Sequence, residues 1–197
     1  MLYIILKYLL SLFFWLIYRP KVKNFGRMFM RGRAIFISNH FSLGDPIRLA
    51  FVAPRPLHFM AKQELFNSPL KRFFLKGLLA FPVYRKQADM LSLKQAMIVL
   101  EKNHIFGIFP EGRRSLTGEL DSFEKGAAFL ALRCAAPILP IYADPNWKAR
   151  KRIRMVVGEV IDPNEIAKRY AGRGVDAVTE AVRDAMQRLK NELELMP

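Results

Sequence analysis

Hydrophobic and polar positions alternate in blocks along this chain, and the blocks predict strands and helices in turn. Short apolar runs, typical of buried strands, are separated by segments whose apolar residues recur every three or four positions, as in an amphipathic helix. The alternation predicts an α/β fold, a single domain with a central, largely parallel sheet flanked by helices. The predicted strands are 33–38, 57–61, 81–84, 105–109, 138–142 and 152–160, and the predicted helices are 45–52, 68–79, 89–102, 123–134, 164–170 and 175–195.

Residues 1–18 form a further predicted helix that is apolar on every face, with Lys7 as its one charged residue. Such a helix would be about 27 Å long, just short of the ~30 Å hydrocarbon core of a bilayer. A helix without a polar face does not suit the surface of a soluble domain. We therefore expect residues 1–18 to anchor the chain in a membrane, either across the bilayer or within one leaflet.

Positive charge is concentrated directly after this segment. The 197-residue chain has 32 Lys and Arg against 17 Asp and Glu, and the first acidic residue is Asp45. A basic collar, residues 19–33, places the domain formed by residues 19–197 on the cytoplasmic side of a cytoplasmic or cell inner membrane, with anionic lipid as a partner. Nucleic acid also attracts such charge, but it leaves the apolar N-terminus unexplained, so we expect no nucleic-acid partner.

The sequence predicts neither a metal site nor an internal disulfide. His58 and His104 have no further ligands at useful spacing, and Cys134 is the only cysteine. Cys134 lies in an apolar run, where a buried, inert thiol is expected.

The segment SNHFSLGDPIR, residues 38–48, places His40 and Asp45 between a predicted strand and a predicted helix. On one continuous helix the two would lie about 140° apart, so they can meet only if the loop folds back. Asp45 followed by Pro46 is typical of an N-cap and a first helical residue, yet loops after strands are where α/β proteins place active sites. Both interpretations stay open on these residues, a helix cap with an incidental histidine or a base paired with a carboxylate. The two roles of Asp45 are compatible because a carboxylate has two oxygens, so we expect Asp45 to cap the helix in either case.

A second polar segment follows the predicted strand 105–109 and reads Glu111, Gly112, Arg113, Arg114 and Ser115. Two adjacent guanidiniums beside a glycine turn suit a phosphate group, although an exposed charged turn explains the same residues.

Together these segments resemble the lysophosphatidic acid acyltransferases of the glycerolipid acyltransferase superfamily. Residues 39–45 match the first family motif, Asn-His-four residues-Asp. Residues 109–115 match the third, Phe-Pro-Glu-Gly-Thr-Arg-Ser, except that Arg113 replaces the threonine. Weaker matches are a hydrophobic stretch ending in Arg85, an apolar proline-containing strand at 136–141, and Lys62.

The resemblance implies an O-acyltransferase of phospholipid biosynthesis. It would move a fatty acyl group from a thioester of coenzyme A or acyl carrier protein to the free hydroxyl of lysophosphatidic acid, giving phosphatidic acid. It implies His40 as general base, Asp45 as its orienting carboxylate, and no cofactor beyond the acyl-donor co-substrate. The implied substrate-binding residues are Glu111, Gly112, Arg113, Arg114, Ser115, Arg85 and Lys62.

Two alternatives remain on the sequence alone. The acceptor could be another lysolipid, such as a lyso-ornithine lipid, because Arg113 could select a different head group. The chain could also be a basic membrane-surface binding protein without catalysis, although its intact motif residues count against that hypothesis.

Overall fold

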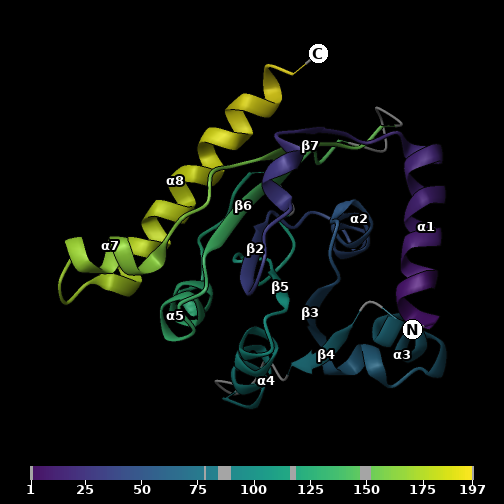
Figure 1. The fold of residues 1–197 in the computed structure, drawn as a ribbon, viewed down its shortest axis with the longest axis horizontal. Helices are drawn as coiled ribbons and strands as arrows, with labels where there is room; N and C mark the ends of the chain where they lie inside the picture. The colour runs from purple at the N-terminus through teal and green to yellow at the C-terminus, as the bar shows by residue number, and fades with distance from the viewer. Residues whose placement is uncertain (1, 78, 84–89, 116–118, 147–151, 197) are drawn as a thin grey trace.

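The computed structural model describes residues 2–77, 79–83, 90–115, 119–146 and 152–196. Its strands form one seven-stranded sheet in the order β1-β7-β6-β2-β5-β3-β4 (Figure 1). Their bounds are β1 (Lys21–Lys23), β2 (Ala34–Ser38), β3 (Leu57–Lys62), β4 (Ala80–Val83), β5 (Ile105–Ile108), β6 (Ile138–Ala143) and β7 (Arg154–Val157). The helices are α1 (Leu2–Tyr18), α2 (Asp45–Val52), α3 (Pro69–Gly77), α4 (Met90–Glu101), α5 (Gly126–Arg133), α7 (Pro163–Arg169) and α8 (Gly174–Glu194), with short 3₁₀ helices η1 (Phe25–Met28) and η2 (Gln63–Phe66).

The five strands β2 to β6 run parallel, so the predicted parallel sheet is confirmed. β7 runs antiparallel to β6, and β1 pairs parallel with β7 at the edge of the sheet. Parallel strands end at one common edge of the sheet, and side chains from the loops that follow them can converge there. Both candidate motifs follow strands of this parallel set, β2 and β5.

Helices cover both faces of the sheet (Figure 1). Ile35 and Ile37 of β2 face a core shared with α4, α5 and α8, whereas Ala34 and Phe36 face a core shared with α1 and α2. Successive strand residues point to opposite faces, and β2 is buried at all its positions. This explains why its sequence is a continuous apolar run and not an alternating one.

Helix α1 packs against α2 through polar tips as well as apolar rings. Lys7 Nζ, Tyr8 Oη and Trp15 Nε1 donate hydrogen bonds of 3.0, 3.1 and 3.3 Å to the backbone carbonyls of residues 53, 54 and 51. Those carbonyls lie at the end of α2, where a helix leaves its last carbonyls without partners of its own. One face of α1 is therefore bound to the domain, and the other exposes Leu9, Leu12, Phe13, Leu16 and Ile17.

The sequence-based expectation for the N-terminus left two membrane geometries open, spanning and lying in one leaflet. Among the described residues, no helix combines the length and the hydropathy that crossing a bilayer requires.

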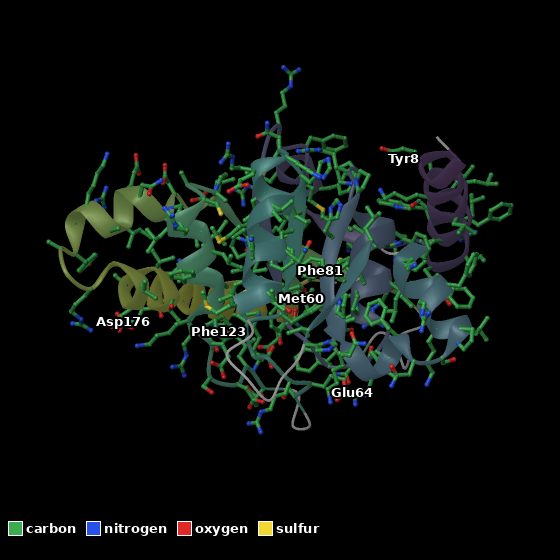
Figure 2. All side chains as sticks on the ribbon, turned by 90° about the horizontal axis from the view of Figure 1, so that it is seen from below. Tyr8, Met60, Glu64, Phe81, Phe123 and Asp176 are labelled. Carbon is green, nitrogen blue, oxygen red and sulfur yellow. The ribbon has the colours of Figure 1, made fainter. Side chains whose placement is uncertain are left out.

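Seen from below, Tyr8 on α1 and Asp176 near the start of α8 lie at opposite ends of the molecule (Figure 2). Met60 of β3 and Phe81 of β4, which are paired in the sheet, lie near its middle.

The sequence missed strand β1, because a three-residue Lys-Val-Lys segment is too short to show a period and reads only as part of the basic collar. Lysines are common on edge strands, where they discourage pairing with other chains. Cys134 is buried, as predicted, and burial raises the pKa of its thiol.

Candidate active site

Asn39 fixes the point at which the chain leaves the sheet. Its side-chain Nδ2 donates to the Ala143 carbonyl at 2.8 Å, and its Oδ1 accepts from the Ala143 N–H at 2.8 Å. This amide therefore continues the pairing of β2 with β6 one step beyond the end of β2. Because Asn39 is buried, the loop that begins with His40 starts from a rigid position.

The loop after β2 folds back around the Asp45 carboxylate. Oδ2 lies 3.0 Å from His40 Nδ1 and accepts the backbone N–H groups of Phe41 and Ser42, each at 2.6 Å. An ionised carboxylate only accepts hydrogen bonds, so Nδ1 of the neutral imidazole carries the proton and Nε2 carries the lone pair. Of the two interpretations left open by the sequence, the paired arrangement is the one observed.

The predicted capping role of Asp45 is wrong. The N-cap of α2 is Gly44, Asp45 is already helical, and no side-chain hydrogen bond caps this helix. The reason is local, because the N–H groups of the preceding loop reach the carboxylate and turn it away from the helix. Asp45 still lies in the first turn, where the helix dipole favours a negative charge.

Two further side chains contact the other carboxylate oxygen. Ser42 Oγ donates to Asp45 Oδ1 at 3.0 Å, and Arg48 Nη2 donates to both Asp45 Oδ1 and Ser42 Oγ. Asp45 and Arg48 are each only 5% exposed. Sequence reasoning missed Arg48, although Asp and Arg three positions apart on a helix are known to pair.

The second motif lies against the backbone of His40. Glu111 Oε1 accepts the His40 N–H at 3.1 Å, and the His40 carbonyl accepts the Ser115 N–H at 2.8 Å. The Phe109 ring stacks on the imidazole with centroids 4.4 Å apart. Two segments about seventy residues apart in sequence thus form a single site at the edge where β2 and β5 end.

Burial sets the electrostatics of this second loop, and a glycine sets its backbone shape. Glu111 is 4% exposed, and burial raises the pKa of its carboxyl to about 7, while hydrogen bonds from the His40 and Asp121 N–H groups act in the opposite direction. Gly112 has φ +63°, in the region that favours glycine, and donates its N–H to the Phe109 carbonyl at 3.1 Å.

The residues predicted to bind substrate differ in their placement. Arg113 is largely exposed and pairs with Asp121 at 3.2 Å, and Arg114 is exposed on the same loop. Ser115 is buried, and its Oγ donates to the Glu119 carbonyl at 2.8 Å. Lys62 is exposed at the carboxyl end of β3, at the same edge of the sheet. Arg85 lies outside the described residues.

The other two histidines lie away from this edge. His58, early in β3, and His104, directly before β5, stack with centroids 4.9 Å apart near the opposite ends of those strands. Within the described ranges, no three His, Cys, Asp or Glu residues gather as metal ligands.

Comparisons with known proteins match the region that contains both motifs. The Acyltransferase family model matches residues 19–144. A 1-acyl-sn-glycerol-3-phosphate acyltransferase of Bacillus subtilis is 30% identical over 166 residues, which cover 81% of this chain and 82% of the relative. The enzyme of the same name from Streptococcus pneumoniae is 29% identical over 165 residues, covering 80% of this chain and 61% of the relative.

A solved structure shares the fold. The 1-acyl-sn-glycerophosphate acyltransferase PlsC of Thermotoga maritima superposes with a TM-score of 0.69 over 91% of this chain and 75% of that one, at 23% sequence identity.

Proposed function

Because this chain belongs to the acyltransferase family, we propose that it transfers a fatty acyl group from a thioester donor to the free hydroxyl of lysophosphatidic acid, giving phosphatidic acid. It is an O-acyltransferase by its relatives. The observation that carries the proposal is the 3.0 Å contact between His40 Nδ1 and Asp45 Oδ2, in a loop held by the segment that carries Arg114.

His40 acts as the general base in this reaction. With Nδ1–H donated to Asp45, Nε2 accepts the proton of the acceptor hydroxyl while the oxygen attacks the thioester carbonyl carbon. Asp45 keeps the imidazole in the correct tautomer and stabilises the imidazolium that forms. The substrate supplies the nucleophilic hydroxyl, so no protein nucleophile is needed.

The tetrahedral intermediate then collapses. The carbon–sulfur bond breaks, the ester oxygen bond is retained, and the leaving thiolate takes the proton from His40 Nε2. The oxyanion of the intermediate needs donors that are already in place, and Lys62, at the same edge of the sheet, is the candidate for this role.

Acceptor binding is assigned to the exposed part of the second loop. Arg114 is an exposed guanidinium close in sequence to two residues that contact His40, Glu111 and Ser115. A guanidinium binds phosphate oxygens in a forked geometry, so we assign the acceptor phosphate to Arg114, whose loop contacts His40 through Glu111 and Ser115. Arg85 is assigned to the same phosphate from the family resemblance.

The location that fits these lipid substrates is the cytoplasmic face of a cell membrane. The outer face of α1 is apolar, and α3 exposes Leu70, Phe73 and Phe74 beside its basic residues. Both helices lie at the same end of the molecule in both views (Figures 1 and 2). Apolar helix faces flanked by lysine and arginine suit insertion into one leaflet of an anionic membrane.

An acceptor panel tests the proposed function. The purified protein is offered lysophosphatidic acid, neutral and zwitterionic lysophospholipids and a lyso-ornithine lipid, each with labelled acyl-coenzyme A and with labelled acyl carrier protein. We expect preferential formation of phosphatidic acid, and the active donor identifies the thioester used. Preference for another lysolipid would show that lysophosphatidic acid is not the acceptor. Absence of product with every donor and acceptor pair would favour the alternative of a non-catalytic membrane-binding protein.

A further inference from the structure

Arg48 contacts the side of the Asp45 carboxylate that faces away from His40. His40 Nδ1 contacts Asp45 Oδ2 at 3.0 Å, whereas Arg48 Nη2 donates to Asp45 Oδ1 and, at 3.1 Å, to Ser42 Oγ. The side chains of Arg48 and Asp45 are 6% and 5% exposed. The carboxylate is thus held between a titratable imidazole and a buried cation.

We propose that Arg48 is a positioning residue for the acyl transfer, which keeps the buried Asp45 carboxylate ionised and correctly directed toward His40. The inference rests on the proposed function, in which His40 is the base. It assigns to Arg48 an effect on the proton affinity of His40, exerted through Asp45 and through its own charge.

Burial makes a compensating cation necessary. A carboxylate removed from water loses hydration, and its charged form persists only if hydrogen bonds and an opposite charge replace that hydration. The backbone N–H groups of Phe41 and Ser42 and the Ser42 hydroxyl donate to the carboxylate and orient it, but they carry no net charge. Arg48 supplies the charge: burial lowers the pKa of its guanidinium only to about 10, so it stays cationic near neutral pH.

Gly44 provides the space that the guanidinium occupies. A Cβ added at this position would lie 2.9 Å from Arg48 Nη1 and 3.6 Å from Ser42 Oγ. Gly44 has φ −82°, which any residue adopts, so the backbone does not require a glycine here. A methyl group at position 44 would therefore displace the guanidinium from Asp45 without removing its charge.

Other charged and titratable groups face this cluster from neighbouring elements. Glu111, after β5, accepts the His40 N–H, and Tyr18 of α1 acts electrostatically on Arg48. Lys7 of α1 lies at the far end of α2, on the Ala53 carbonyl. These groups are retained when Arg48 or Gly44 is changed, so a change in His40 is attributable to the guanidinium.

The sign of the effect follows from charge. Loss of the Arg48 cation removes a repulsion acting on the imidazolium and leaves the proton of the His40–Asp45 pair as the remaining way to neutralise the buried carboxylate, so the pair binds that proton more tightly. The acid limb of the pH–rate profile then moves to higher pH. At a pH below that limb, the rate falls about tenfold for every pH unit by which the limb moves, because only the unprotonated base is active.

The test combines an NMR titration of His40 with pH profiles of kcat/KM. The chain has 3 histidines, which makes the imidazole signals assignable. In Arg48→Met we expect the pKa of His40 to rise by about one pH unit and the acid limb to move upward with it. Arg48→Lys should return both values toward wild type, with a lower kcat, because an ammonium lacks the fork that contacts Asp45 and Ser42 together.

Two further variants complete the design. Gly44→Ala should change the His40 pKa in the same direction but by less, and it should add nothing in the Arg48→Met background. Arg55→Met is the matched control, because the Arg55 guanidinium donates to the carbonyls of Met30, Gly32 and Asn103, away from His40. It should lower stability while leaving the His40 pKa and the acid limb unchanged.

An unchanged His40 pKa and acid limb in folded Arg48→Met would overturn the proposal. If that variant does not fold, Arg48→Lys and Gly44→Ala decide, and wild-type values for the His40 pKa and kcat in both would overturn it. A wild-type protein inactive with every acceptor would refute the proposed function instead, because the NMR titration still measures the effect of Arg48 on His40.

Discussion

His40 is held by buried groups, whereas Arg114, the guanidinium assigned to the acceptor phosphate within the described residues, is exposed. This division separates residues that set the chemistry from residues that set affinity. Asp45, Glu111 and Ser115 each contact His40, so they determine its orientation. Arg114 is exposed, and we expect it to act mainly on binding of the acceptor phosphate.

Arg114→Ala should raise the KM for lysophosphatidic acid about tenfold to a hundredfold, the effect of losing a charge-assisted hydrogen bond of about 1.5–3 kcal/mol. The neighbouring Arg113→Thr is the control, because Arg113 already pairs with Asp121 and the family has threonine there. Steady-state kinetics with varied acceptor measure both. Equal effects of the two substitutions would contradict the assignment of the phosphate to Arg114.

The raised pKa of Glu111 predicts a pH dependence of stability, which Glu111→Gln should remove. The folded-state pKa of Glu111 is raised from 4.5 to about 7, so the folded protein binds the Glu111 proton more tightly than the unfolded chain does. The resulting contribution to the free energy of unfolding is complete below the unfolded pKa and is lost as pH rises through about 7. Urea unfolding between about pH 4.5 and 8 should show wild type losing up to about 3 kcal/mol relative to the variant.

Comparing wild type with Glu111→Gln cancels the contributions of other titrating groups to stability, because both proteins contain those groups. One of them is His58, whose pKa is lowered by burial and by His104, so its contribution to the free energy of unfolding is lost as pH falls. Parallel stability curves for wild type and Glu111→Gln would show that Glu111 is not the source of the pH dependence.

At the scale of elements, the hydrophobic pattern predicted where helices and strands lie but not how their ends are held. Helix α2 has the predicted bounds, yet its N-cap is Gly44 and not Asp45, because donors in the preceding loop compete for the carboxylate. The contacts within that loop are local, but it is also held by Ala143, Glu111 and Ser115, which lie about seventy or more residues further along the chain. No local pattern could have specified these long-range contacts.

Helix α1 shows the same limit. Its composition predicted an apolar helix, but the attachment of one face to α2 through Lys7, Tyr8 and Trp15 depends on tertiary structure. The two faces therefore have separable roles, and substitutions on each should have different effects.

Phe14→Ala, on the inner face of α1, should destabilise the protein by about 3 kcal/mol, because Phe14 is buried and its ring contacts Tyr18 and Phe51. Leu16→Ser with Ile17→Ser, on the exposed face, should leave the melting temperature nearly unchanged but reduce sedimentation with lipid vesicles. Calorimetry and vesicle sedimentation on both variants check this. The reverse pattern would contradict the two-sided assignment of α1.

At the scale of the whole molecule, the alternation of elements was sufficient to predict a parallel α/β sheet. The family resemblance assigned the segments of His40 and Glu111 to one site, and the two segments are in contact. Strand order was not predictable, because neighbours such as β2 and β5 are paired by packing across distant segments. The three-residue spacing of Asp45 and Arg48 on a helix was a signal for their pairing, but the shared contact of Arg48 with Asp45 and Ser42 depends on the placement of α2.

The net charge of +15 gives a prediction at this scale. Binding to vesicles containing anionic lipid should exceed binding to zwitterionic vesicles and should weaken as salt rises from about 0.05 to 0.5 M, because the electrostatic part is screened. The remaining binding at high salt should be reduced by the Leu16→Ser and Ile17→Ser substitutions. Equal, salt-independent binding to both vesicle types would contradict a role for the charge.

The central claim is that His40, oriented by Asp45, takes the proton of the acceptor hydroxyl. Its most direct test is acyl transfer to lysophosphatidic acid by His40→Ala, beside His104→Ala as the matched histidine control at the other edge of the sheet. We predict that His40→Ala remains folded and binds vesicles but loses turnover by about a hundredfold or more, while His104→Ala stays close to wild type. Near-normal turnover in folded His40→Ala would contradict the mechanism.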